Sequence, residues 1–320
     1  MAGLIDFDSL PKVEGQPQGN AWGLWGHDDQ IGTLNKISPE AKVAAAQEVK
    51  VGKSVSLDLP LDHFGYMVGK RLLFKQNILD FGKVNGFMIG YDDELHFNTQ
   101  SSSQWDGLRH YALQESGLYY NGLKHEDILE KKDGKLGTHH WVEAGGIVGR
   151  GVLIDYARWR EETGQKPIPA NSTYGVTVEE LKAVAKHQNL EFKAGDILIL
   201  RTGFTLWHAG AAHEDRVETL NKIEFMGVQR SREMVKFLWN NHFSAVATDS
   251  LGFEECPLVG DYTLHEWILA HWGMPLGELW NLEPLSKLCA EQKRWSFLFS
   301  SAPLYVPGGV GTPPNAIAML

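Results

Sequence analysis

The sequence contains little cysteine. Only Cys256 and Cys289 occur among its 320 residues, and their spacing matches no metal-binding motif. Two cysteines in a chain of this length argue against a disulfide scaffold, on which small secreted domains depend. The first residues also lack the basic and apolar stretches of a signal peptide. We therefore expect a cytoplasmic protein in a reducing environment.

Positive charge and long apolar runs are scarce as well. The chain has 30 lysines and arginines against 40 acidic residues, which gives a formal net charge of −10. This acidic excess is spread along the chain, and it argues against nucleic acid or an anionic membrane as a partner. No apolar run approaches the ~20 residues that a membrane-spanning helix needs. We expect a small-molecule substrate as the partner.

Two common catalytic motifs are missing. The stretch GGIVGRG at residues 145–151 is glycine-rich, but it leads into a strand pattern and does not match the dinucleotide-binding motif GxGxxG. A GxSxG motif is also missing, so a serine-hydrolase function lacks support. The candidate chemistry therefore rests on acidic, histidine and amide side chains.

Strand and helix patterns alternate along the chain. A capping box formed by Thr177 and Glu180 marks one helix start, and Ser38 followed by Pro39 marks another. Apolar runs predict strands within residues 54–64, 145–159, 195–204 and 244–250. Helical patterns occur within residues 39–49, 105–119, 178–187, 225–240 and 263–273.

This mixture predicts an α/β fold. Residues 1–25 are rich in glycine, proline and glutamine, which predicts an extended N-terminal arm. No linker or repeat divides residues 26–320. We expect these residues to form one domain in which helices flank a mixed β-sheet.

The segment FNTQSSSQWDGLRHYAL, residues 97–113, places Asp106 four residues before His110. On a helix this spacing puts both side chains on one face, with the carboxylate near the N-terminal end, where the helix dipole favours it. Such a carboxylate can bind a divalent metal, and a nearby histidine can transfer protons near neutral pH. Taken alone, the pair fits a helix cap beside an ordinary hydrogen-bonded histidine better, because such pairs are common.

Two further clusters contain histidine. Residues 264–282 include His265 and Glu278, and the carboxylate of Glu278 lies among apolar residues, where it needs a partner. His139 and His140 are adjacent, so their side chains should diverge and at most one should face a given site. A structural role for that third cluster is as compatible with the sequence as substrate contact.

Several segments, in the same order, resemble those of the cyclase family that includes bacterial kynurenine formamidase and isatin hydrolase, most closely its fungal-type branch. The resemblance covers nearly the whole chain. It implies a swivelling β/β/α fold and a homodimer or homotetramer. The segments are WGHDDQIGTLNKISPE, GGIVGRGVLIDY, GDILILRTGF, SAVATDSLGFEECP and APLYVPGGVGTPPNAIA.

The family's signature is HxxxHxDxxxH. It aligns with Gln100, Gln104, Asp106 and His110, so glutamines replace both leading histidines. Neutral imidazole is a strong ligand for zinc and manganese, whereas an amide oxygen is a weak one. The replacement should therefore damage one metal position of the family.

The family's second pair of ligands, a histidine and a glutamate, matches His265 and Glu278. The resemblance thus implies one divalent metal, manganese or zinc, held by Asp106, His265 and Glu278. In the family the metal activates a water that attacks an amide or lactam carbonyl, while the last signature histidine, here His110, handles protons. We expect Gln104 to orient the water or the substrate carbonyl, and Glu278 to take part in catalysis.

Eleven tryptophans are many for this length, and several lie close to the histidines in the sequence. Aromatic side chains of this kind can line a pocket for an aromatic substrate. The candidate substrate contacts are Trp25, Gln100, Trp105, His140 and Trp141.

Three functions follow, and they differ in their chemistry. The leading hypothesis is a single-metal hydrolase of a non-peptide C–N bond in a small cyclic amide or aryl formamide. In a metal-free alternative, Asp106, His110 and Glu278 act as an acid–base set for cyclisation, dehydration or isomerisation of a small aromatic or polyketide-like metabolite. A binding protein that has lost the chemistry is the third. The sequence leaves open the substrate and the choice between ring opening and ring closing.

Overall fold

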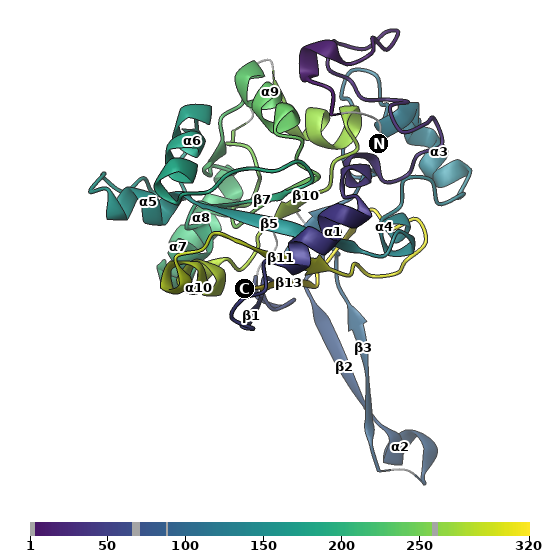
Figure 1. Ribbon diagram of the computed structural model, residues 1–320. Helices are drawn as coiled ribbons and strands as arrows, with labels where there is room; N and C mark the ends of the chain where they lie inside the picture. Colours follow the sequence, from purple (N-terminus) through teal and green to yellow (C-terminus); the bar gives the residue numbers. More distant parts are fainter. Residues whose placement is uncertain (1–3, 66–70, 88, 258–261) are drawn as a thin grey trace.

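The computed structural model describes residues 4–65, 71–87, 89–257 and 262–320. A nine-stranded mixed sheet forms its centre (Figure 1). Its four middle strands are parallel to one another, and the outer strands pair antiparallel. In spatial order they are β1 (Ser54–Ser56), β13 (Ala316–Met319), β11 (Ser296–Ser301), β5 (Ile147–Asp155), β7 (Ile197–Arg201), β9 (Ala245–Thr248), β10 (Leu276–Glu278), β4 (Gln104–Asp106) and β12 (Gly311–Thr312).

Helices lie on both sides of the central strands (Figure 1). The α-helices of the body are α1 (Pro39–Ala46), α3 (His125–Glu130), α4 (His139–Glu143), α5 (Tyr156–Glu162), α6 (Val178–His187), α7 (Phe204–Gly210), α8 (His213–Lys222), α9 (Arg232–Asn240) and α10 (Glu283–Gln292). Short 3-10 helices are η1 (Phe7–Ser9), η2 (Gly32–Lys36) and η3 (Tyr120–Gly122), and η4 (Glu266–His271) is a π-helix. No helix within the described ranges is both long and apolar enough to cross a bilayer. The predicted single α/β domain with a mixed sheet is confirmed.

Local sequence signals predict several elements correctly. The Thr177 hydroxyl accepts from the Glu180 N–H, and the Glu180 carboxylate accepts from the Thr177 N–H, so α6 begins with the predicted capping box. Ser38 caps α1 in the same way by accepting from the Ala41 N–H. The predicted strands at β5, β7 and β9 are also present.

The predicted helix over residues 105–119 is wrong. Residues 104–106 form β4, and residues 107–119 form turns in which the Gly107 N–H donates to the Val310 carbonyl. Pairing of β4 with strands distant in the sequence therefore overrides the local helical pattern. The predicted strand over residues 54–64 is short, because regular pairing ends at Ser56, before Pro60.

The amphipathic segment over residues 225–240 also divides into two. Its first part contributes β8 (Gly227–Val228), which pairs with β6 (Gly175–Val176). The helix α9 begins only at Arg232, after Ser231 caps it by accepting from the Met234 N–H. The predicted helix over residues 263–273 is present, with η4 as its main part.

The described part of the N-terminal arm has little regular structure, but it packs on its own chain. Phe7 and Leu10 are buried, and the Phe7 N–H donates to the Asn240 side chain at the end of α9. The Trp22 indole N–H donates to the Ala270 carbonyl of η4. These contacts bring the N-terminal segment close to the helix that carries His265.

A two-stranded hairpin projects from the body (Figure 1). It consists of β2 (Lys75–Asp80) and β3 (Tyr91–His96), with α2 (Phe81–Asn85) near its tip. The register pairs Ile78 with Asp93, Asp80 with Tyr91 and Gln76 with Leu95. Because paired and alternate residues share a face, Ile78, Tyr91 and Leu95 lie on the same face. All three are exposed.

The capping box provides a test of how α6 is held in the fold. We expect Thr177→Ala to lower the free energy of unfolding by about 1 kcal/mol, because the Glu180 N–H loses its acceptor. Chemical denaturation measures this change. Thr163→Ala removes an exposed hydroxyl at the end of α5 and should change stability much less. An equal effect of the two variants would contradict the capping role.

Candidate active site

The pairing of β4 with β10 builds one side of the site. Gln104 lies directly opposite Glu278, and its side-chain nitrogen donates to Glu278 Oε2 at 2.8 Å. Asp106 is two residues further along β4, so its side chain is on the same face as that of Gln104. Trp105 faces the other way, into the core. Two short strands thus bring two carboxylates and one amide together.

Asp106 and His110 meet, although no helix joins them. His110 Nε2 lies 3.7 Å from Asp106 Oδ2. The side-chain nitrogen of Gln100 contacts both residues: it donates to Asp106 Oδ1 and lies 3.0 Å from His110 Nδ1. Because that nitrogen is a donor, Nδ1 of His110 must accept, and a neutral His110 carries its proton on Nε2.

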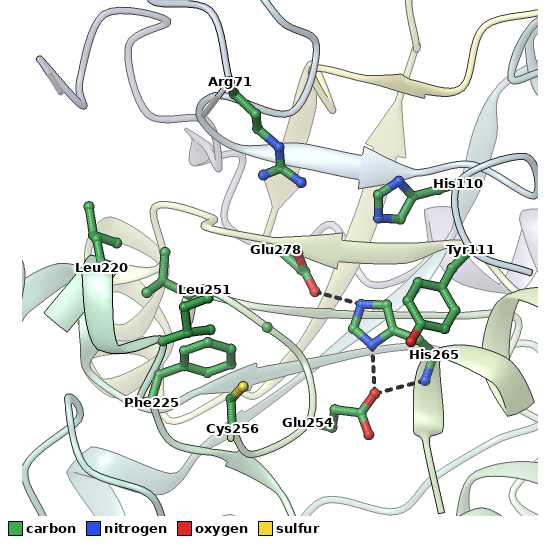
Figure 2. Close-up of a pocket in the computed structure, with 12 residues that line it drawn as sticks. Arg71, His110, Tyr111, Leu220, Phe225, Leu251, Glu254, Cys256, His265 and Glu278 are labelled. Carbon is green, nitrogen blue, oxygen red and sulfur yellow. Dashed lines mark hydrogen bonds and ion pairs between the residues drawn. The ribbon is translucent and has the colours of Figure 1, made fainter. Parts of the chain in front are cut away.

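His265 connects the two carboxylates of the site to a third. Its Nδ1 lies 2.6 Å from Glu254 Oε1, and its Nε2 lies 3.2 Å from Glu278 Oε1 (Figure 2). The same Nε2 is 4.0 Å from Asp106 Oδ2. Glu254 also accepts the backbone N–H of His265 and forms an ion pair with Arg230 at 3.1 Å. Glu254 therefore fixes the orientation of the imidazole that faces Asp106 and Glu278.

The electrostatics of this group reflect its burial. Burial raises the pKa of Asp106; nearby His110 opposes this change, and the charge of Glu278 adds to it. Burial acts to lower the pKa of His265, but hydrogen bonds to Glu254 and Glu278 outweigh it and hold the pKa well above its ordinary value. Three carboxylates therefore surround one imidazole in a buried position, an arrangement that favours a positive charge at its centre.

Two buried oxygens at this place have no hydrogen-bond partner. They are Asp106 Oδ2 and Gln104 Oε1. Asp106, His265 and Glu278 each offer one ligand atom, and these atoms lie within 4.8 Å of one another. Carboxylate oxygen and imidazole nitrogen are good ligands for zinc and manganese. The residues present therefore fit a divalent metal, and the unpartnered Asp106 oxygen supports it most directly.

A pocket of about 290 Å³ opens beside these groups (Figure 2). Asp106 is fully buried, whereas Glu278 contributes to the pocket wall. Within the described ranges the lining residues are Arg71, His110, Tyr111, Leu220, Ile223, Phe225, Leu251, Gly252, Glu254, Cys256, His265 and Glu278. The volume is small for a ligand site and suits a small metabolite.

The predicted aromatic contacts do not line this pocket. Trp105 and Trp141 are fully buried in the core, and the ring of Trp105 packs edge-on against Trp280 with centroids 4.7 Å apart. Trp25 packs against Trp239 instead. The number of tryptophans in a sequence does not show which face of an element each one occupies. Here Trp105 and Trp141 lie in the core, where large aromatic side chains are often buried.

His140 lies on α4 and is also outside the pocket lining. Its Nδ1 is 2.9 Å from Glu143, and its ring lies beside that of His139 with centroids 3.9 Å apart. The predicted divergence of the two histidines is therefore wrong. Gln100 is buried behind His110 and Asp106, where it binds these side chains.

Sequence reasoning missed two residues of the site. Glu254 lies in the segment SAVATDSLGFEECP, but nothing in its spacing links it to His265. Arg71 lines the pocket and donates to the Gln100 carbonyl at 2.7 Å. Arg71 lies just before the hairpin, and Gln100 lies just after it. Both contacts arise only from the tertiary fold.

Comparisons with known proteins identify the relationship. The family model named Cyclase matches residues 26–255. A crystal structure of a protein described as a novel cyclase is 31% identical, with a TM-score of 0.82, and the match covers 94% of this chain and 99% of that one. The chain belongs to the cyclase family. No curated protein sequence gives a significant match.

Other solved structures share the fold of this cyclase-family chain at low identity. Isatin hydrolase A from Labrenzia aggregata is 16% identical with a TM-score of 0.56, and the match covers 88% of this chain and 99% of that one. Isatin hydrolase A from Ralstonia solanacearum is 16% identical with a TM-score of 0.53, covering 87% and 94%. These likenesses support the expected fold, and the 31%-identical cyclase supports the family.

The contact between Glu254 and His265 can be tested through metal affinity. We expect Glu254→Gln to weaken binding of Mn²⁺ or Zn²⁺ by roughly 10- to 100-fold, because the imidazole loses the carboxylate that orients it. Isothermal titration calorimetry measures the change. Glu255→Gln alters the neighbouring carboxylate, which accepts from the Arg230 N–H, and should bind metal like the unaltered chain. Unchanged affinity in Glu254→Gln would show that His265 does not need this partner.

Proposed function

We propose that this cyclase-family enzyme hydrolyses a non-peptide C–N bond in a small cyclic amide or aryl formamide. The observation that carries this proposal is the group formed by Asp106, His265 and Glu278, with its unpartnered carboxylate oxygen, beside a small pocket. The structural likeness to isatin hydrolases is consistent with it.

The proposed reaction needs a metal, and Asp106, His265 and Glu278 are the residues that would hold it. A bound divalent metal supplies positive charge that polarises a carbonyl group and acidifies water. The glutamines take no ligand position through nitrogen, because their amide N–H groups face Asp106 and Glu278. We infer one metal per chain, manganese or zinc, because Asp106, His265 and Glu278 form one ligand group in this pocket.

The remaining steps belong to side chains of the pocket. Water attacks the carbonyl carbon and loses a proton, and we assign that proton to Glu278 because its carboxylate lines the pocket. Gln104 holds the second oxygen of Glu278 and so fixes the direction of the carboxylate. Transfer of the proton to the leaving nitrogen then accompanies cleavage of the C–N bond and gives a carboxylate and an amine.

His110 has a more limited role than the sequence suggested. With Nδ1 occupied by Gln100, neutral His110 has no lone pair free on that nitrogen and a donor N–H on Nε2. We propose that it donates a hydrogen bond to the carbonyl oxygen as negative charge develops there. Arg71 lines the same pocket, and its guanidinium adds positive charge on the side away from His265 (Figure 2).

A metal-free acid–base enzyme is the second candidate, and one observation favours it. Burial raises the pKa of Asp106, which suits a general base, and the Gln100 amide holds its carboxylate in place by donating to one of its oxygens. Such an enzyme would catalyse cyclisation, dehydration or isomerisation of a small metabolite.

Metal content separates the two candidates. We expect protein purified without a metal-affinity tag to contain about one equivalent of manganese or zinc, measured by elemental analysis. Glu278→Gln should lose the metal and lower kcat for amide hydrolysis at least about 100-fold, because one ligand and the proton acceptor are both altered. Asp106→Asn should also lose the metal.

The control for these variants is Glu266→Gln. Glu266 follows His265 directly, but its carboxylate accepts from the Gln114 N–H outside the proposed ligand group. It should retain metal and activity. A chain that stays free of metal after incubation with Mn²⁺ and Zn²⁺, or activity that survives a chelator, would exclude the metal hydrolase and favour the acid–base enzyme.

We also propose that the chain forms a homodimer or homotetramer through the hairpin. Two-stranded hairpins are marginally stable alone in water, and this one exposes Ile78, Tyr91 and Leu95 on one face. Among the side chains that the structure describes, six of the 16 exposed large apolar ones fall within residues 72–95. Exposed large apolar side chains that gather on one projecting element are typical of a protein–protein contact.

The hairpin contact can be tested by charge. We expect the double variant Ile78→Lys and Tyr91→Lys to shift the chain toward a monomer in sedimentation velocity, because two lysines would have to be buried at the contact. Leu129→Lys places a charge at an equally exposed position on α3 and should leave the oligomer intact. The hairpin assignment fails if the double variant keeps the oligomeric state of the unaltered chain.

A further inference from the structure

The proposed reaction uses only one half of the pocket. The catalytic half carries His110, His265 and Glu278, and Figure 2 shows the apolar side chains grouped away from them. This second half comes from the end of α8, the segment that follows it, and the loop after β9. Its residues are Leu220, Ile223, Phe225, Leu251 and Cys256.

Ile223 is unusual in its backbone conformation. It follows the last residue of α8 with φ 53° and ψ 48°, in the left-handed region. Glycine normally takes this position at the end of a helix, and a β-branched residue there is strained. Strained backbone conformations occur more often at functional sites than elsewhere. The Ile223 side chain lines the pocket.

Exposure indicates where this half of the pocket opens. Leu220 is 8% exposed, whereas Ile223 is 52% exposed although it lines the same cavity. The apolar wall therefore runs from the interior to solvent at the end of α8. A ligand that fills it can extend out of the pocket, which a compact ring system would not need.

The chemistry of the wall points to a chain of methylene groups. Leu220, Ile223 and Leu251 are aliphatic, and Phe225 is held against Gly252, where a Cβ would meet its ring at 2.6 Å. No tryptophan lines the pocket within the residues described. Aliphatic side chains bind flexible apolar chains through burial of area, and three of the five side chains of this wall are aliphatic.

We propose that the substrate carries an alkyl chain of several carbons, which lies along Leu220, Ile223 and Leu251 and reaches solvent beside α8. This inference rests on the proposed function for the position of the amide, at the polar half of the pocket. It defines the substrate class as an alkyl-substituted small amide, and it makes Ile223 a specificity-determining residue.

Binding of a homologous series tests this inference. The probes are 5-alkyl-2-pyrrolidinones with side chains from methyl to hexyl, and oxindole is the flat aromatic lactam for comparison. Isothermal titration calorimetry with the full chain, with and without a chelator, gives each Kd. We expect Kd to fall about threefold per added methylene over the first carbons, and the hexyl compound to bind more tightly than oxindole. A Kd independent of chain length, or tighter binding of oxindole, would overturn the proposal.

A pair of glycine variants separates the subsite from effects on folding. Ile223→Gly removes the side chain but suits the left-handed backbone, so the chain should fold with an unchanged or higher Tm. It should weaken binding of the hexyl compound roughly fivefold and leave the methyl compound almost unaffected. Lys293→Gly makes the same change at the left-handed end of α10, away from the pocket, and should leave both Kd values unchanged. Equal behaviour of the two variants would remove Ile223 from the subsite.

The measurement is independent of turnover, so the two proposals can fail separately. Chain-length-dependent binding without lactam hydrolysis would support the alkyl subsite and count against the hydrolase. Hydrolysis of lactams with no dependence of Kd on chain length would support the hydrolase and overturn the alkyl subsite.

Discussion

The structure of the site depends on the antiparallel pairing of β4 with β10. These strands have three residues each, and their register sets Gln104 opposite Glu278 and Asp106 opposite Leu276. Because side chains alternate, this register directs the acidic groups to one face and Trp105 to the core. A shift by one residue would turn the carboxylates away from the site and Trp105 toward it. The site therefore requires this register.

Gln100 and Gln104 change the chemistry of the site. An imidazole could give a lone pair to a metal, but each amide here gives a hydrogen bond to a carboxylate. The two glutamines thus supply two neutral donors where the family's signature has histidines. Asp106 keeps one oxygen without a partner, and that oxygen faces His265 at 4.0 Å. The remaining ligand group has one imidazole and two carboxylates, enough for a single cation.

The sequence predicted the elements that depend on local signals. The capping box at Thr177 and the β-branched runs of β5 and β7 need only neighbouring residues, and they were placed correctly. The helix predicted after Gln104 is wrong because β4 pairs with residues of β10 that lie 170 to 174 positions away. The acidic and histidine members of the site came from motif resemblance. Glu254 and Arg71 could not be found, because their contacts with the site depend on how distant segments pack.

The hairpin is connected directly to residues of the candidate site. Its two strands leave the body near Arg71 and return at Gln100, so both of its ends lie beside the pocket. A neighbouring chain that binds the hairpin would also restrain Arg71 and Gln100. The Gln100 amide sets the tautomer of His110. Self-association and catalytic geometry would then be thermodynamically linked, and dilution alone would lower the activity of each chain.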